Sequence, residues 1–168
     1  MRLAYEFYHR DCLTVARELV GKLLITKKGA DEKCLRITET EAYFGENDTA
    51  CHAHKGRTKR SEALYMGAGT VYVYLCYGIH HLMNVITGDI DDPQGVLIRA
   101  CENAKGPGIL TKKLGIDMSF NRRDIITDDL IRIEDDGSAF NIKTAPRVGI
   151  GYASKEDQEK PWRFILDR

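Results

Sequence analysis

The sequence lacks long apolar runs and has no excess of either charge. No apolar segment in the 168 residues approaches the roughly 20 residues that cross a bilayer. The stretch 1–6 has no apolar core of a secretory signal, so we expect a cytoplasmic protein with no membrane contact. Lys+Arg and Asp+Glu number 25 each. This balance argues against a protein that coats nucleic acid through its overall charge, although it does not exclude a local basic patch.

The sequence also lacks the cysteine spacing of a disulfide framework and the ligand spacing of a common metal site. The five cysteines are scattered and form no CxxC pair. This usage suits reduced thiols in the cytosol better than a disulfide framework. His52 and His54, and then His80 and His81, form short histidine motifs, but no spacing matches a common zinc site. We therefore expect no metal and no other cofactor.

The remaining composition and patterning predict one α+β domain over residues 1–168. Apolar residues make up 43% and prolines number four, as in an ordinary globular chain without linkers. Asp11 is a plausible N-cap for a helix over 11–20, and Gly106-Pro107 begins a second helix that ends before Gly115. The predicted strands cover residues 22–27, 33–41, 70–76, 82–87 and 94–101, with weaker candidates at 130–133 and 148–152.

The order of these elements favours a particular architecture. Strands follow one another at hairpin-like spacing, which predicts a curved, mainly antiparallel sheet of open-barrel form, flanked by helices and with a protruding β-hairpin. The polar segment 45–68 is predicted to be a long structured loop with one short helix near 61–66. Loops of that length are more often functional than decorative.

Two acids in the segment 35–43 form the first candidate site. If the strand alternates regularly, Glu39 and Glu41 share a face with Leu35, Ile37 and Tyr43. Burial of a carboxylate is costly unless it has partners, so acids that continue an apolar row indicate a functional site. The alternative is that the strand ends near Ile37 and both acids are solvated.

An aromatic strand and two basic clusters form the next candidates. Tyr72 and Tyr74 share one strand face, and Tyr77 lies at the expected turn. An aromatic residue at a hairpin tip can act as a wedge between base steps, but tyrosines also pack on sheet edges without such a role. Basic residues gather in 55–60 and 112–123, where they either contact phosphates or form a solvated surface.

Taken together, these segments resemble the alkyladenine (3-methyladenine, or N-methylpurine) DNA glycosylase family. The resemblance covers about 7–164 and is carried by Glu39-Thr40-Glu41-Ala42-Tyr43, His52, Tyr72-Val73-Tyr74-Leu75-Cys76-Tyr77-Gly78, Met83-Asn84, Val96-Leu97-Ile98-Arg99-Ala100, Gly106-Pro107-Gly108 and Arg147-Val148-Gly149-Ile150-Gly151. It implies a base-excision repair enzyme that flips a nucleotide out of DNA. The enzyme then hydrolyses the N-glycosidic bond of alkylated or deaminated purines, the class of 3-methyladenine, 7-methylguanine, hypoxanthine and ethenoadenine, without lyase activity.

The resemblance also implies roles for individual residues. Glu41 resembles the general base, with Arg99 and the backbone carbonyl of Val148 as further contacts of the attacking water. Tyr77 resembles the residue that fills the gap left in the duplex. The residues that correspond to the family's base-binding site are Tyr43, His52, Tyr74, Asn84 and Leu97, of which Asn84 corresponds to the screen against the amino group of guanine.

Two other functions remain open at the level of sequence. A non-catalytic nucleic-acid-binding module would use the same aromatic hairpin and basic loops, but it would need neither Glu41 nor Arg99. A small hydrolase with a His/Cys metal site is the other alternative. The expected partner for the leading hypothesis is double-stranded DNA that contains damaged purines, bound by a monomer.

Overall fold

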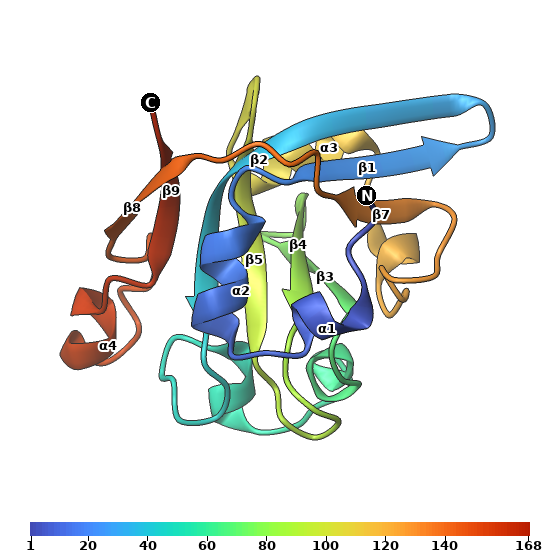
Figure 1. Cartoon of the computed structure of the whole chain (residues 1–168). Coiled ribbons are helices and arrows are strands. Elements are labelled where there is room, and N and C mark those ends of the chain that lie inside the picture. Colours follow the sequence, from blue (N-terminus) through green and yellow to red (C-terminus); the bar gives the residue numbers. More distant parts are fainter.

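A curled antiparallel sheet forms the centre of the fold (Figure 1). The computed structural model describes residues 1–168. The main path of the sheet runs β3-β4-β5-β2-β1-β7, with β6 beside β5, β9 beside β2, and β8 beside β9. The strands are β1 (Leu23–Lys28), β2 (Asp31–Tyr43), β3 (Val71–Cys76), β4 (His80–Ile86), β5 (Gly95–Cys101), β6 (Ala104–Lys105), β7 (Ile131–Glu134), β8 (Asn141–Ala145) and β9 (Arg163–Asp167).

Short helices cover this sheet, so the α+β prediction is confirmed. The α-helices are α1 (Tyr5–Tyr8), α2 (Cys12–Leu19), α3 (Pro107–Leu114) and α4 (Lys155–Glu159), and the 3₁₀ helices are η1 (His52–Lys55), η2 (Glu62–Tyr65) and η3 (Met118–Phe120). None of these helices combines the length and the apolar character needed to span a bilayer.

The two predicted helices form where local signals place them. The Asp11 carboxylate caps α2 by accepting a hydrogen bond from the Thr14 amide at 2.9 Å. Pro107 opens α3, and Gly115 closes it in the left-handed conformation at φ 72°. Both helices bury their apolar side chains in the same core, which also takes in Phe120 of η3 and much of the sheet.

The long strand β2 organises the sheet. Its first half pairs with β1, and its second half lies between β5 on one edge and β9 on the other. Helix α2 packs against this strand (Figure 1). The Thr40 hydroxyl donates a hydrogen bond to the Ala16 carbonyl at 2.7 Å. The second half of β2 is thus held on both edges and on one face, which leaves the other face for a site.

The expectation that Glu39 and Glu41 continue the apolar row of Ile37 is wrong. The β2–β5 register is irregular between Ile37 and Thr40, at Thr38 on β2 and Arg99 on β5. The side chains of Ile37 and Ala42 both lie in the core, although they are an odd number of residues apart. In a regular strand such residues would lie on opposite faces, so the irregularity must switch the alternation of side chains between them. The two acids consequently lie on the sheet face opposite to Ile37. The strand itself does not end near Ile37, since β2 continues to Tyr43.

The C-terminal quarter departs most from the prediction. Residues 148–152 form bends and turns instead of a strand, because Gly149 has a φ of 73° that a regular strand does not accommodate. The sequence patterns did not indicate the antiparallel pair of β8 and β9, of which β9 pairs with β2. In Figure 1 this pair lies at the edge of the molecule, with α4 below it. The turn that holds Val148 consequently approaches the second half of β2.

Candidate active site

One row of paired residues crosses five strands and defines the face that carries the site. Tyr72 pairs with Asn84, Asn84 with Leu97, Leu97 with Glu41, and Glu41 with Arg163. Residues that are directly opposite in neighbouring strands project to the same side of a sheet. The structure therefore brings together three residues predicted for the site, Asn84, Leu97 and Glu41, from β4, β5 and β2.

Glu41 is completely buried, with 0% of its surface exposed. Its Oε2 accepts a hydrogen bond from the Val148 amide at 2.6 Å. Its Oε1 has only longer contacts, 3.4 Å from the Tyr43 hydroxyl and 3.5 Å from Arg99 Nη1. One carboxylate oxygen is thus firmly held, while the other has no short hydrogen bond from the protein.

The surroundings of Glu41 act on its pKa in opposite directions. Burial raises the pKa of this carboxyl, while the Val148 amide and the positive charges of Arg99 and Arg147 oppose that rise, and the net direction is upward. A carboxylate with a raised pKa is a stronger base than a solvated one. The site can therefore accept a proton from water, which is the work of a general base.

Arg99 is held by a second acid. Its Nε lies 3.3 Å from Glu39 Oε1, and the same oxygen accepts a hydrogen bond from Arg163 Nη1 at 2.9 Å. Glu39 therefore lies between two guanidinium groups and orients Arg99 toward Glu41. A groove of about 920 Å³ begins here, lined by Glu39, Arg99, Lys105, Val148, Arg163 and Arg168 among others.

Aromatic side chains enclose a small pocket on the other side of Glu41. Its volume is about 40 Å³, and its lining includes Tyr43, His52, Tyr72, Tyr74, Asn84 and Tyr152. The rings of His52 and Tyr74 lie 4.4 Å apart at 63°, and His52 Nδ1 is 2.9 Å from the Tyr72 hydroxyl. Burial lowers the pKa of His52, and the nearby positive charges of Arg60 and Lys55 act in the same direction, so the site favours the neutral ring. Of the residues predicted to bind a base, only Leu97 does not line this pocket; it is buried beneath, between Asn84 and Glu41.

Tyr77 is the most exposed aromatic residue near the site, with 92% of its surface accessible. It lies at the tip of the β3–β4 hairpin, where φ is 52° at Tyr77 and 69° at Gly78. The Ile79 amide donates to the Cys76 carbonyl at 3.2 Å. Both central residues of this turn thus have positive φ angles, and the loop between the paired residues Cys76 and His80 is three residues long. The turn projects the tyrosine ring away from the sheet.

The predicted basic cluster is only partly assembled. Lys55 and Arg60 line a groove of about 670 Å³ beside the aromatic pocket, together with His52 and His54. Arg57 is instead paired with Glu62 at 2.6 Å and with Asp91 at 2.7 Å. The histidines do not gather, and no three metal-ligating side chains come together anywhere in the chain.

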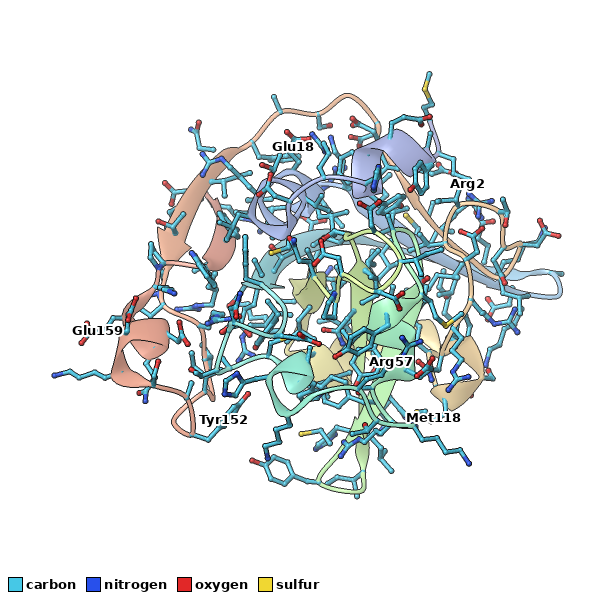
Figure 2. All side chains as sticks on the ribbon, turned by 90° about the horizontal axis from the view of Figure 1, so that it is seen from below. Arg2, Glu18, Arg57, Met118, Tyr152 and Glu159 are labelled. Carbon is cyan, nitrogen blue, oxygen red and sulfur yellow. The ribbon has the colours of Figure 1, made fainter.

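Sequence reasoning missed three residues around the pocket. Tyr152, 67% exposed, donates its hydroxyl to the Ala50 carbonyl at 2.7 Å and borders the pocket, close to the 45–68 loop (Figure 2). Arg147 and Asp48 form a completely buried ion pair with an N–O distance of 2.6 Å. Nothing local marks these residues, because the partners of each contact are about a hundred positions apart in the chain.

A pocket lined by aromatic rings is typical of enzymes that act on a nucleobase taken out of its stack, and here it lies beside a buried carboxylate. The chain belongs to the methylpurine-DNA glycosylase (MPG) family, whose model matches residues 6–168. A relative from Borreliella afzelii (strain PKo) is 42% identical over 96% of this chain and 94% of its own length. Another from Legionella pneumophila (strain Lens) is 43% identical, over 98% and 94% respectively. Both relatives carry the name "Putative 3-methyladenine DNA glycosylase".

The burial of Glu41 gives a prediction about stability. Because its pKa is higher in the folded chain than in the unfolded one, the protonated form favours folding, and this contribution is lost as the pH rises through the folded pKa. We expect Glu41→Gln to raise the Tm at pH 7–8, by about 2–4 °C for each kcal/mol relieved, and the gain to vanish below about pH 4. Calorimetry of both proteins over this pH range is the measurement. A variant less stable than wild type at neutral pH would contradict the prediction.

Proposed function

We propose that this protein acts, as a monomer, on double-stranded DNA and hydrolyses the N-glycosidic bond of alkylated or deaminated purines. The observation that carries the proposal is the burial of Glu41 between the Val148 amide and Arg99, beside the aromatic pocket. A protein that only binds nucleic acid gains nothing from a desolvated carboxylate, which weakens its fold. Membership of the methylpurine-DNA glycosylase family supports the same reaction.

The reaction that we assign to this site is a displacement by water. The bond between the base nitrogen and the sugar C1′ breaks, and its electron pair leaves with the base. A cationic alkylated base thereby becomes neutral, whereas a deaminated base leaves as an anion that takes a proton from solvent. The sugar becomes positively charged in the manner of an oxocarbenium ion, which the Glu41 carboxylate stabilises. Water adds to C1′ and gives its proton to Glu41, while Arg99 and the Val148 carbonyl orient the water. The products are a free base and an abasic site, and no strand break follows because no enzyme amine bonds to the sugar.

The aromatic pocket is assigned to the extruded base. Tyr43, His52 and Tyr74 contribute aromatic rings to its lining. Stacking on such rings contributes about 1–3 kcal/mol per base and favours cationic, alkylated purines. Asn84 donates an amide hydrogen to the Tyr72 carbonyl at 3.2 Å, which fixes the amide that we assign to discrimination against guanine.

The size of the pocket requires that it open. A volume of about 40 Å³ admits about three water molecules, so a purine enters only when the lining moves. His52 and Tyr152 are the side chains best placed to do so, because both also line the open groove next to the pocket. The wedge at Tyr77 offsets the cost of extrusion, which is a few kcal/mol.

Two duplex oligonucleotides test the proposed function, one with hypoxanthine and one treated to carry alkylated purines. We expect free base from at least one of them and strand breaks only after alkali. Breaks without alkali would contradict the absence of lyase activity. Tight duplex binding with no base release from either substrate would favour the non-catalytic binding module.

A further inference from the structure

We propose that Arg147, held by Asp48, is a positioning residue that ties the aromatic pocket to the general base Glu41. The role of Glu41 as a general base rests on the proposed function, whereas the contacts of Arg147 do not depend on it. Arg147 lines neither the aromatic pocket nor the groove beside Arg99. It acts through the backbone and side chains around it, on two sides of the site at once.

The Arg147 guanidinium is held through both of its Nη atoms and by two aromatic rings, while its buried Nε has no hydrogen-bond partner. Its side chain is 0% exposed and forms two parallel hydrogen bonds with Asp48, Nη1 to Oδ2 at 2.6 Å and Nη2 to Oδ1 at 2.9 Å. It lies between two rings, with its central carbon 4.9 Å from the centroids of both Tyr43 and Trp162. Such a bidentate, stacked arrangement suits arginine and no other residue. The guanidinium therefore cannot move without moving the Tyr43 ring that faces the pocket.

Asp48 carries this constraint to the base-binding loop. Its carboxylate also accepts hydrogen bonds from the backbone amides of Phe44 at 3.0 Å and Ala50 at 3.1 Å. The loop that it closes runs directly into Cys51 and His52, which line the pocket. The position of His52 thus depends on the same ion pair as that of Tyr43.

The opposite side of Arg147 leads to the general base. Nη1 donates to the Ala42 carbonyl at 3.0 Å, one residue after Glu41 in β2. The next residue along the chain, Val148, donates its amide hydrogen to Glu41 at 2.6 Å. Arg147 therefore anchors the turn of 147–151, which has no strand partner, against β2. That anchoring fixes the direction of the hydrogen bond that holds Glu41.

Arg147 also acts on Glu41 through its charge. The groups that face Glu41 come from β2, β3, β5, β9 and the 147–152 turn: Glu39, Tyr43, Tyr74, Arg99, Arg147, Tyr152 and, through Glu39, Arg163. Among these, only Arg99 and Arg147 bring positive charge that acts directly on Glu41. Loss of Arg147 removes one of these charges and loosens the Val148 amide. Both effects make the ionised carboxylate less favourable.

Direct titration of Glu41 tests the proposal without any need for activity. The carboxyl signal is followed by carbon-13 NMR and identified by its absence in Glu41→Gln. The test protein is the double variant Arg147→Met/Asp48→Asn, which removes both charges and leaves no unpaired buried ion. Arg147→Lys keeps the charge and removes the forked hydrogen bonds. Leu24→Ala, a core substitution far from the site, is the control for general loss of stability.

We expect the pKa of Glu41 to rise in the double variant, to rise less in Arg147→Lys, and to stay unchanged in Leu24→Ala. In single-turnover assays, the acidic limb of base release should move to higher pH by the same amount. Lesion binding should weaken as well, because Tyr43 and His52 lose their anchor.

An unshifted Glu41 pKa in the double variant, with its fold intact, would overturn the proposal and leave the ion pair a purely structural role. If the double variant does not fold, Arg147→Lys gives the same decision. Failure of the proposed function has a different signature: wild type releases no base at any pH, while the NMR titration still decides whether Arg147 sets the state of Glu41.

Discussion

Glu41→Gln is expected to slow base release by about 10²–10⁴-fold and to leave the affinity for a lesion duplex within a few-fold of wild type. Glutamine keeps the shape of the side chain and can still accept the Val148 hydrogen bond, seen at 2.6 Å to Oε2. It cannot take a proton from water or stabilise positive charge on the sugar. The loss should therefore fall on the chemical step, which single-turnover kinetics with saturating enzyme isolates.

Glu39→Gln is the matched control for that experiment. Glu39 belongs to the same strand face and contacts Arg99 at 3.3 Å, but it does not touch Glu41 or the aromatic pocket. Its substitution should slow base release much less, since Arg99 loses an anchor but the base remains. Equal losses for the two variants, or normal turnover of Glu41→Gln, would show that the general base is misassigned.

Tyr77→Ala is expected to weaken binding to a lesion duplex by about 1–3 kcal/mol, or roughly 5- to 150-fold. The ring is almost fully exposed at the hairpin tip, so its removal costs the folded protein no buried contact. In the proposed complex with a duplex it fills the gap that the extruded nucleotide leaves, whereas a single strand has no such gap. Base release from a single strand should therefore change little. Equilibrium binding to the duplex and kinetics on both substrates are the measurements.

Two further substitutions separate a wedge from a hydrophobic contact. Tyr77→Phe keeps the ring and should bind nearly as wild type does. Ile79→Ala removes the exposed neighbour in the same turn and should have a smaller effect than Tyr77→Ala. Losses of similar size on duplex and single-stranded substrates would argue against a wedge, and so would a Tyr77→Phe variant as weak as Tyr77→Ala.

Local signals allowed much of the fold to be predicted. The cap of α2 at Asp11 and the Pro107 and Gly115 limits of α3 depend on residues within a few positions of each other. The hairpin at Tyr77 was predicted for the same reason, because alternating Val and Tyr on one side and Gly78 at the turn are neighbours in the sequence. In the site, Glu41 and Arg99 were found to approach as the resemblance implied, at 3.5 Å.

Long-range features were beyond such signals. The side that Glu41 faces depends on an irregularity shared by β2 and β5, and neither strand reveals it alone. The ion pair of Arg147 and Asp48 joins segments 99 residues apart, and no local pattern indicates that both charges are buried. The pair of β8 and β9 owes its place to the pairing of β9 with β2. Strand 148–152 was predicted from its apolar residues, although glycine in a left-handed conformation forms a turn there.

The irregularity at Thr38 and Arg99 also constrains how this gene can change over generations. A substitution at either position alters a side chain, but it keeps the number of residues between Ile37, which faces the core, and Glu41, which faces the site. An insertion or deletion of one residue in that interval would exchange the two sides of the strand, turning Glu41 toward the core and Ala42 toward the site. We therefore expect this spacing to be inherited together with Glu41. Among relatives of this chain, we expect alignment gaps to avoid the interval 37–41 even where residue identities within it vary.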